Sequence, residues 1–338
     1  MKEAMFYEKS DDNHVNCSLC NHRCRNIGES QRGLCGVREN INGKLFSLVY
    51  ARLVARSVDP IEKKPLFHFF PGSLSYSIST VGCNFRCDNC QNFDISQMPT
   101  EREVIIGRET PPEAVVLAAK QNGCKSIAYT YTEPTIFFEY ALDVAKLAKK
   151  EGLENVFVTN GYITEEALRE IAPYLDASNI DLKSFSDAFY HKTCGARLQP
   201  VLDCIKLHKK LGIWVELTTL IIPTLNDSEK ELKQIAAFIN DEVGPETPWH
   251  VSGFHPMYKL LDVASTPVET LQKARQIGLQ TGLKYVYVGN VPGENGESTF
   301  CPKCGKNLIH RIGYCINENM IQDSSCPFCG AKIDGEFC

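Results

Sequence analysis

The sequence predicts an α/β protein built around a parallel sheet. Between residues 74 and 290, short strand-like runs alternate with helical stretches. The strand-like runs are rich in Val, Ile, Thr and aromatic residues, as expected for strands covered on both faces. Helices that separate consecutive strands indicate right-handed βα crossovers, and therefore parallel strands.

Seven strands and six helical regions are predicted in this part of the chain. The strands are expected at residues 74–80, 126–132, 155–160, 177–182, 213–222, 249–254 and 284–289. The helices are expected at 110–123, 134–152, 164–175, 201–212, 227–244 and 266–282. Thr110 and Glu113 form a candidate capping box at the first helix, and Pro111 suits its first turn.

Periodicity alone is compatible with an open doubly wound sheet and with a full or partial barrel. In either architecture, ligands bind at the C-terminal ends of the strands. Residues that directly follow a strand are therefore the first candidates for a functional site.

Composition and charge exclude several classes of protein. The chain has 338 residues, enough for one large domain with small attachments. A net charge of -5 and a pI near 6.0 argue against a general binder of nucleic acid or of anionic membranes. No apolar run approaches the roughly 20 residues that span a bilayer, and the N-terminus resembles no signal peptide. We therefore expect a cytoplasmic protein.

Sixteen cysteines in such a chain point to metal ligation rather than to disulfides, because the cytosol keeps thiols reduced. Eleven of them fall into three sets with metal-ligand spacing: Cys17, Cys20, Cys24 and Cys35; Cys83, Cys87 and Cys90; and Cys301, Cys304, Cys326 and Cys329. The other five are scattered, and we interpret them as small buried residues. Among these five, Cys194 follows the fourth predicted strand and is a candidate hydrogen-atom donor.

The two ends differ from the middle, and we divide the chain into a Cys-rich segment (1–50), a central domain (51–292) and a C-terminal domain (293–338). In the last, the CPKCG and CPFCG turns predict a zinc ribbon, with rubredoxin-type iron or a cluster as the alternatives. From Thr299 onward four basic residues balance four acidic ones, so a nucleic-acid footprint is lacking. A structural cap or a protein docking surface fits better.

The N-terminal cysteine set leaves two interpretations open. It fits zinc, with His14 or His22 nearby, and it fits an auxiliary [4Fe–4S] cluster that relays electrons. Five basic residues against two acidic ones between positions 21 and 45 would suit an anionic cluster.

The three-cysteine loop at residues 83–90 directly follows the first predicted strand. Three thiolates on one tight loop can hold three irons of a [4Fe–4S] cluster and leave the fourth iron free. Zinc more often takes four ligands from two separated pairs. A free iron can bind a chelating ligand and pass it one electron.

At this loop the sequence resembles a known family. CNFRCDNC is similar to the CxxxCxxC motif of radical S-adenosylmethionine (radical SAM) enzymes, over roughly residues 74–290. The flanking text DPIEKKPLFHFFPGS and TVGCNFRCDNCQNFDISQ resembles the AmmeMemoRadiSam-system enzymes, which are pyruvate formate-lyase-activating-enzyme-like. The resemblance implies a partial (β/α)6-type TIM barrel, a [4Fe–4S] cluster on Cys83, Cys87 and Cys90, and S-adenosylmethionine as cofactor.

The implied activity is reductive cleavage of S-adenosylmethionine to a 5′-deoxyadenosyl radical, which abstracts a hydrogen from an unassigned substrate. The implied partners are a one-electron donor of the flavodoxin or ferredoxin type and proteins of the AMMECR and MEMO types. Two alternatives are a glycyl-radical activase that acts on a protein partner and a non-catalytic iron–sulfur and zinc protein that carries electrons or acts as a scaffold.

The resemblance also implies roles for residues at four strand ends. Glu133, followed by Pro134, would bind the ammonium group of S-adenosylmethionine, and His255 would contact its ribose. The pairs Thr159 with Asn160 and Asp181 with Lys183 would hold the carboxylate and a monovalent cation. The competing interpretations are a helix N-terminal acid for Glu133, a structural ion pair for Asp181 and Lys183, and a structural histidine for His255.

Four positions depart from the family pattern. Tyr131 and Thr132 replace glycines before Glu133, and Val158 replaces an aspartate. Asn89 stands where an aromatic residue usually helps to enclose adenine, so another aromatic, Phe85 or Phe93, would have to do so.

Overall fold

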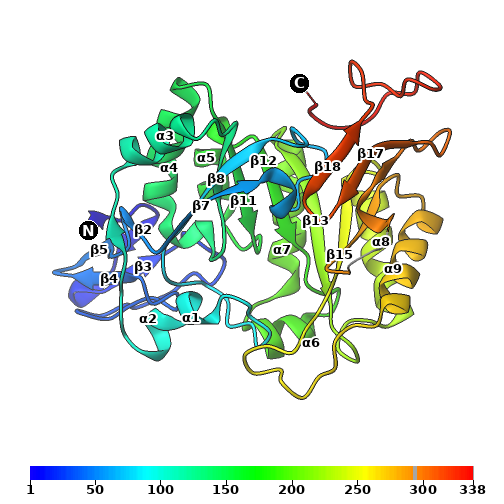
Figure 1. The fold of residues 1–338 in the computed structure, drawn as a ribbon. Coiled ribbons are helices and arrows are strands. Elements are labelled where there is room, and N and C mark those ends of the chain that lie inside the picture. Colours follow the sequence, from blue (N-terminus) through cyan, green and yellow to red (C-terminus); the bar gives the residue numbers. More distant parts are fainter. Residues whose placement is uncertain (292–294, 338) are drawn as a thin grey trace.

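The computed structural model describes residues 1–291 and 295–337. Its centre is one eight-stranded sheet with the order β15-β14-β13-β12-β11-β10-β8-β7 (Figure 1). The strands are β7 (Ala55–Pro60), β8 (Leu74–Ser79), β10 (Ser126–Tyr129), β11 (Glu154–Thr159), β12 (Ala177–Asp181), β13 (Trp214–Ile221), β14 (Trp249–Gly253) and β15 (Val286–Gly289).

The seven strands from β8 to β15 are parallel and lie in chain order, as the alternating pattern predicts. β7 pairs antiparallel with β8 and forms one edge, and β15 forms the other. Because the two edge strands do not pair with each other, the barrel is partial. The predicted α/β fold with a partial barrel is confirmed, and the antiparallel edge strand is an addition to it.

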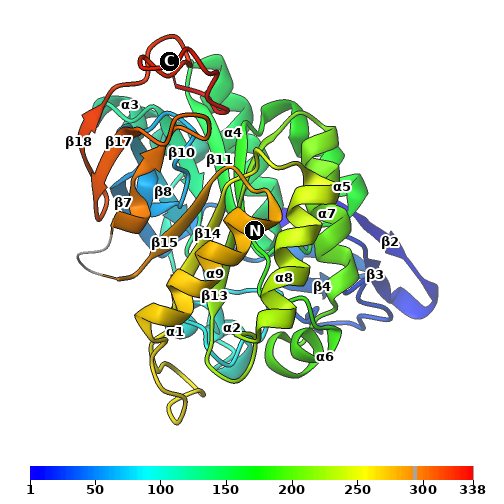
Figure 2. The same cartoon turned by 90° about the vertical axis from the view of Figure 1, so that its right-hand side faces the viewer.

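The crossover helices cover the outside of this sheet, and α7, α8 and α9 are seen in front of it in Figure 2. The main helices are α3 (Pro112–Gln121), α4 (Phe138–Lys150), α5 (Glu165–Ile171), α7 (Leu198–Lys210), α8 (Glu229–Phe238) and α9 (Val268–Thr281). Shorter helical segments are α1 (Phe93–Ser96), α2 (Met98–Glu101), α6 (Asp187–Phe189), 3-10 turns at Asp11–Asn13, Ile61–Lys63, Pro134–Phe137, Ala172–Tyr174 and Asn295–Glu297, and π turns at Tyr190–Cys194 and Ile239–Val243.

The predicted capping box at the first of these helices is wrong. α3 begins at Pro112 with Pro111 as its N-cap, and no side chain caps it. The hydroxyl of Thr110 instead donates to the carbonyl of Arg108. Two consecutive prolines shift the start of the helix by one residue, because the residue before a proline is pushed into extended backbone.

The N-terminal segment is a set of small antiparallel sheets beside the first half of the barrel (Figure 1). Its strands are β1 (Lys2–Glu3), β2 (Tyr7–Lys9), β3 (Val15–Cys17), β4 (Arg38–Ile41), β5 (Lys44–Ser47) and β6 (Arg52–Leu53), the last pairing with β9 (Arg108–Glu109). Val15 and Leu45 are fully buried in the same apolar cluster as Ile127 and Phe137 of the barrel region. The segment is therefore packed into the barrel's own core.

The C-terminal residues form a three-stranded antiparallel sheet of β16 (Thr299–Phe300), β17 (Asn307–Ile312) and β18 (Cys315–Asn319). Its end is tied to the loop before β8, since the N–H of Glu336 donates to the carbonyl of His68 at 2.7 Å. The ring of His68 bonds in turn to the Asp334 carbonyl and to the Tyr287 hydroxyl of β15. The small sheet is thus held against the open side of the barrel.

No helix in the part of the chain that the structure describes is long and apolar enough to cross a membrane. The fifteen described cysteines are free thiols. The division of the chain at residues 50 and 292 stays a prediction.

Candidate active site

The three-cysteine loop lies at the C-terminal end of β8, where the sequence places it. Gly82 opens the loop with φ +102°, and its N–H donates to the Ile95 carbonyl at 3.0 Å. Further along, the N–H groups of Arg86 and Asp88 donate to the carbonyls of Cys194 and Thr193 at 2.9 and 3.0 Å. These backbone bonds to two other segments fix the shape of the loop without using its thiols.

The sulfur atoms of this loop lie among hydrogen-bond donors. The N–H of Phe85 donates to Cys83 Sγ at 3.3 Å, Asn160 Nδ2 lies 3.9 Å from the same sulfur, and Ser96 Oγ lies 3.2 Å from Cys90 Sγ. Burial raises the pKa of both Cys83 and Cys90. A bound cation would therefore be needed to keep these thiols ionised, and donors to sulfur would stabilise the resulting charge.

The loop opens into a cavity of about 320 Å³ at the C-terminal ends of the strands. Of the residues expected in the site, six line it: Cys83, Cys87, Cys90, Asn160, Asp181 and Lys183. Three thiols on one side and a polar strand-end wall on the other suit a cluster with a free iron and a polar ligand between them.

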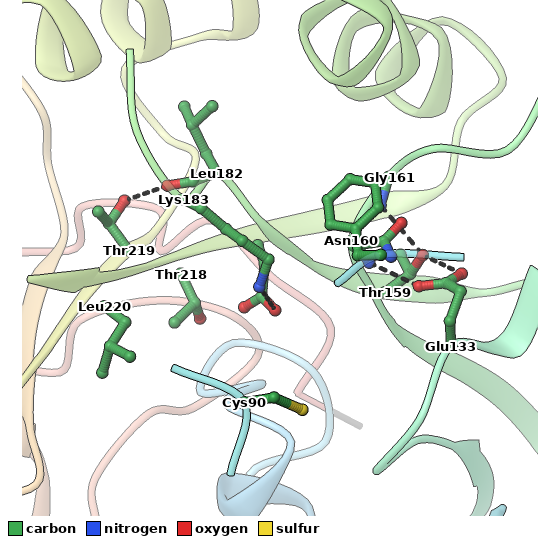
Figure 3. A network of polar contacts seen from close by, with 12 residues as sticks. Cys90, Glu133, Thr159, Asn160, Gly161, Leu182, Lys183, Thr218, Thr219 and Leu220 are labelled. Carbon is green, nitrogen blue, oxygen red and sulfur yellow. Dashed lines mark hydrogen bonds and ion pairs between the residues drawn. The ribbon is translucent and has the colours of Figure 1, made fainter. Parts of the chain in front are cut away.

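Glu133 organises the turn that follows β11 (Figure 3). Its Oε1 accepts from the N–H and hydroxyl of Thr135 and from the hydroxyl of Thr159 at 2.8 Å, and its Oε2 accepts from the N–H of Asn160 at 2.8 Å. Asn160 then reaches Asn84 Oδ1 with its side-chain amide at 2.7 Å. Glu133 thus acts as the N-cap of the 3-10 turn that begins at Pro134. It also bonds to Thr159 and Asn160, and Asn160 connects this network to the cysteine loop.

The carboxylate of Glu133 is buried beside the cavity rather than on its lining. Burial raises its pKa, although its four donors oppose that shift. Oε1 accepts three hydrogen bonds and Oε2 only one, so Oε2 retains room for a further donor.

Asp181 and Lys183 lie at the end of β12 and form an ion pair of 2.8 Å between Lys183 Nζ and Asp181 Oδ2. Burial alone would lower the pKa of Lys183, but Asp181 and the thiols of Cys87 and Cys194 together raise it well above its usual value. The ammonium group is therefore charged at every physiological pH. Both residues line the cavity that the cysteine loop opens into, which is where a ligand-binding pair would have to lie.

Tyr131 occupies the position of an expected glycine and keeps a glycine-like backbone, with φ +65°. Its hydroxyl donates to Asp59 Oδ2 at 2.5 Å, and its carbonyl accepts from Asn92 Nδ2 at 2.7 Å. Although burial would raise the pKa of Asp59, hydrogen bonds from Lys64, Tyr131 and Lys63 hold it well below its usual range. The missing glycine is thus replaced by a tethered tyrosine in the left-handed conformation.

The two aromatic candidates beside the cavity differ in their surroundings. Phe85 is 1% exposed and lines the cavity, while Phe93 stacks on Tyr258 with 4.6 Å between ring centroids. Asn89 also lines the cavity, and its buried Oδ1 has no hydrogen-bond partner among the described residues. That unpaired acceptor is available to an N–H group of a bound ligand.

His255 does not line the cysteine cavity. It is exposed, its Nδ1 lies 3.1 Å from Ser265 Oγ, and it lines a second cavity of about 740 Å³. The two cavities adjoin, since Pro65, Gln91, Ser252 and Asn290 belong to the walls of both. The far wall of the larger cavity is supplied by residues 310–314 of the C-terminal sheet.

The C-terminal cysteines fit a single metal ion. Cys301, Cys304, Cys326 and Cys329 have sulfurs within 4.8 Å of one another, with 3.6 Å from Cys301 to Cys329 and 3.7 Å from Cys304 to Cys326. An ion that holds four sulfurs at ~2.3 Å in a tetrahedron keeps them about 3.8 Å apart. Among the described residues, no other group of three or more metal-ligating side chains is so compact.

The sequence signals missed part of this site. Lys63, Tyr131, Thr218, Ser252 and Asn290 all line the cysteine cavity. Ser252 and Asn290 lie at the ends of β14 and β15, where ligand-binding residues are expected, whereas Thr218 lies within β13 and is in register with Asp181 of β12. Lys63 belongs to the stretch DPIEKKPLFHFFPGS that resembles the family, but nothing there marks it as a cavity residue; it reaches the cavity because the edge strand β7 pairs with β8.

Comparison with known proteins agrees with this geometry. The family model described as the radical SAM superfamily matches residues 77–239. An uncharacterized protein of Methanocaldococcus jannaschii is 51% identical over 338 residues, 99% of each chain. A pyruvate formate-lyase-activating enzyme of Clostridium pasteurianum is 27% identical over 213 residues, which are 60% of this chain and 87% of that enzyme.

Among solved structures, a radical SAM methyltransferase from Sphaerobacter thermophilus superposes with a TM-score of 0.51 at 14% identity, covering 65% of this chain and 67% of that one. That likeness concerns the fold. The AmmeMemoRadiSam subtype and the individual site residues stay predictions. The motif loop, the partial barrel and these relatives agree: the chain belongs to the radical SAM superfamily and is an enzyme of the radical SAM type.

Proposed function

We propose that this enzyme reductively cleaves S-adenosylmethionine to a 5′-deoxyadenosyl radical and abstracts a hydrogen atom from a substrate bound in the larger cavity. The observation that carries the proposal is the single cavity shared by Cys83, Cys87 and Cys90 and by the strand-end residues Asn160, Asp181 and Lys183. A [4Fe–4S] cluster held by the three cysteines would supply one electron to the sulfonium group and one open coordination position.

The residues of the cavity wall would bind and orient S-adenosylmethionine by charge. The ammonium group of Lys183 suits the methionyl carboxylate. The carboxylate of Asp181 suits a cation beside the methionyl carboxylate. Glu133 is not part of the wall, but it bonds to Asn160, which is, and the free lone pair on its Oε2 is the acceptor we propose for the methionyl ammonium. Asn89 Oδ1 would accept from the exocyclic amine of adenine, in place of the aromatic residue that is absent there.

The larger cavity would hold the substrate. It adjoins the cysteine cavity along four shared residues and is bounded by the C-terminal sheet, which lies beyond the family match that ends at residue 239. A cavity of about 740 Å³ is of the size that takes a small molecule. A wall that the superfamily does not share fits a substrate specific to this chain and its relatives.

A second candidate is activation of a glycyl-radical enzyme, favoured by the relative named a pyruvate formate-lyase-activating enzyme. A protein substrate would have to thread a peptide segment into the same cavity, past Ile312 and Tyr314 at its rim. The size of the cavity favours the small molecule. A glycyl-radical EPR signal on a partner protein during turnover would instead favour activation of a glycyl-radical enzyme.

The test is anaerobic turnover. The reconstituted protein is reduced with dithionite, S-adenosylmethionine is added, and 5′-deoxyadenosine is quantified. Wild type should form product, Cys87→Ala should form none, and Cys315→Ala, which removes an exposed cysteine outside the three sets, should match wild type. A fully loaded cluster that neither cleaves S-adenosylmethionine nor changes its EPR signal on adding it would contradict the proposal and favour the scaffold alternative.

Relatives of the activating-enzyme type indicate that a one-electron donor is needed. We propose a flavodoxin or ferredoxin for this role, zinc in the C-terminal ribbon, and the cytoplasm as the location. Partnership with proteins of the AMMECR and MEMO types stays a prediction.

A further inference from the structure

The proposed function assigns no role to the four N-terminal cysteines. Cys17, Cys20, Cys24 and Cys35 are brought together by the hairpin β2–β3 and the turns before β4. The Cys17 N–H donates to the Cys24 carbonyl at 2.9 Å, and the Arg23 N–H donates to the Cys20 carbonyl at 3.0 Å. A Cβ on Gly33, two residues before Cys35, would lie 3.6 Å from the Cys24 sulfur. Cys17 and Cys35 are buried, and Cys20 and Cys24 are half-buried.

Arg38 of β4 supplies the second, independent observation. Its side chain is 2% exposed, and its Nη2 donates to the Met5 carbonyl and to Glu139 Oε1 at 2.9 Å. Its Nε and Nη1 are buried and have no partner among the described residues. The guanidinium lies within electrostatic reach of Cys17, Cys24 and Cys35. Two buried donors without acceptors beside three of the thiols indicate that sulfur atoms of a metal centre are their acceptors.

The spacing of the thiols separates zinc from a cluster. In the C-terminal ribbon the four sulfurs fit around one ion, all within 4.8 Å of one another. Among the described residues, neither the N-terminal set nor the catalytic loop contains three sulfurs that close together. A [4Fe–4S] cluster holds each thiolate on a separate iron, and therefore holds them further apart than one ion does. The N-terminal set thus resembles the catalytic loop rather than the ribbon.

This cysteine set directly contacts the catalytic loop. His22 Nε2 donates to the Asn84 carbonyl at 2.7 Å, and Arg86 donates to the carbonyl of Leu34, next to Cys35. A Cβ on Gly82 would lie 3.3 Å from the Cys35 carbonyl oxygen. The backbone just before Cys83 is therefore in contact with the backbone at Cys35.

We propose that Cys17, Cys20, Cys24 and Cys35 hold a second [4Fe–4S] cluster that relays electrons to the catalytic cluster. The relay rests on the proposed function, whereas the metal centre itself does not. The N-terminal cluster would take one electron from a reduced flavodoxin or ferredoxin and would pass it to the cluster on Cys83, Cys87 and Cys90. That electron would be used to break one C–S bond of S-adenosylmethionine, giving methionine and the 5′-deoxyadenosyl radical.

A basic groove beside this centre fits the donor. A cavity of about 500 Å³ next to the N-terminal turns is lined by five basic side chains and two acidic ones. The basic residues are Arg23, Arg169, Arg197, Lys206 and Lys210. Arg23 lies between Cys20 and Cys24 in the sequence. Arg23, Arg169 and Lys206 form ion pairs with Glu166, Glu165 and Glu242, so the positive charge left over in the groove comes from Arg197 and Lys210. These two side chains would be complementary to an acidic electron-transfer protein and would speed its association.

The metal centre is tested in a full-length variant that lacks the catalytic cluster, Cys83→Ala with Cys87→Ala and Cys90→Ala. We expect it to retain iron and sulfide for one cluster and to give an EPR signal on reduction that S-adenosylmethionine does not change. Adding Cys17→Ala and Cys20→Ala should abolish that signal, whereas adding Cys315→Ala should not. Two zinc ions per chain with no iron, or no metal beyond the ribbon, would overturn the assignment.

The relay is tested by comparing two reductants in Cys17→Ala with Cys20→Ala. The ratio of flavodoxin-driven to dithionite-driven 5′-deoxyadenosine formation should fall well below that of wild type, because dithionite is small enough to reach the catalytic cluster directly. Arg197→Glu should lower the same ratio and weaken its dependence on salt. An unchanged ratio would refute the relay. Failure of wild type with dithionite would instead refute the proposed function, and the iron content above would still decide the metal centre.

Discussion

Gly82 is the point where the two cysteine segments meet, so Gly82→Ala tests the contact between them. The new methyl group would lie 2.6 Å from Val37 Cγ1 and 3.3 Å from the Cys35 carbonyl oxygen. The backbone there has φ +102°, which L-residues rarely adopt. Strained backbone of this kind costs ~1–3 kcal/mol. Overpacking a filled site costs about the same again, typically ~1–3 kcal/mol.

The expected loss of stability for Gly82→Ala is therefore about 2–6 kcal/mol. A matched control separates the cost of backbone strain from the cost of overpacking. Gly212 also has positive φ, +80°, but a Cβ there would meet nothing within 4 Å, so Gly212→Ala carries the backbone strain alone. The assay is urea denaturation of the metal-loaded protein, together with its iron content. We expect Gly82→Ala to be the more damaging of the two by about 1–3 kcal/mol and to lose iron.

The clash has one main partner, which allows a double-mutant cycle. Val37→Ala removes the methyl group that the new Cβ would meet. In the double variant the overpacking cost should disappear, giving a coupling energy of about 1–3 kcal/mol. If Gly82→Ala costs no more than Gly212→Ala, or if the cycle shows no coupling, the segments do not pack as described, and the basis for a relay between them is lost.

Three further predictions concern other parts of the chain. Arg38→Met should destabilise the protein by ~3–5 kcal/mol because it leaves Glu139 buried and unpaired, and Arg38→Met with Glu139→Leu should recover most of that loss in the same denaturation assay. Burial lowers the pKa of His208 to about 4, so only the unfolded chain takes up its proton as pH falls below ~6.5. The free energy of unfolding should then drop by about 1 kcal/mol between pH 7 and pH 5.5, a loss that His208→Gln should remove. Finally, Cys326→Ser should release one zinc per chain from the ribbon, and iron lost in its place on metal analysis would contradict the zinc assignment.

The fold could be predicted where local pattern and tertiary structure agree. The seven parallel strands are apolar runs that end in turns, and burial on both faces requires that pattern. The strand prediction is wrong at the end of β10. The sequence pattern predicts a strand through residue 132, but β10 ends at Tyr129. Tyr131 leaves the strand because Asp59 and Asn92, both distant in sequence, hold it in the left-handed conformation. No local signal carries that information.

The edge strand β7 was missed for a related reason. Its burial alternates along residues 55–60, and its sequence ends in Asp59 and Pro60, which disfavour strands. It is a strand only because β8 offers a free edge to pair with. That pairing brings Asp59 to Tyr131 and carries Lys63 to the cavity, so the edge strand and the missed site residues have one cause.

The candidate site, like the fold, could be predicted only in part. Cysteine spacing alone predicted the four thiols that the structure gathers in the C-terminal ribbon, because each CxxC turn supplies two ligands that are close in sequence. The metal-binding role of the other two sets stays a prediction. The positive side chain beside the N-terminal thiols could not be predicted from spacing. Arg38 reaches the N-terminal thiols from β4, and its partner Glu139 comes from α4, about a hundred residues later in the chain. A charge partner needs only to be close in space, so it leaves no spacing pattern.

The additions to the barrel lie on two different sides of the catalytic loop. The N-terminal segment contacts that loop at Gly82, Asn84 and Arg86, whereas the C-terminal sheet walls the cavity beyond Ser252 and Asn290. Both lie outside the family match at residues 77–239. Under the proposed function and the proposed relay, the barrel generates the radical, the N-terminal segment supplies electrons from one side, and the C-terminal sheet bounds the substrate on the other. Loss of the ribbon metal should then alter substrate use, while loss of the N-terminal centre should alter only the choice of reductant.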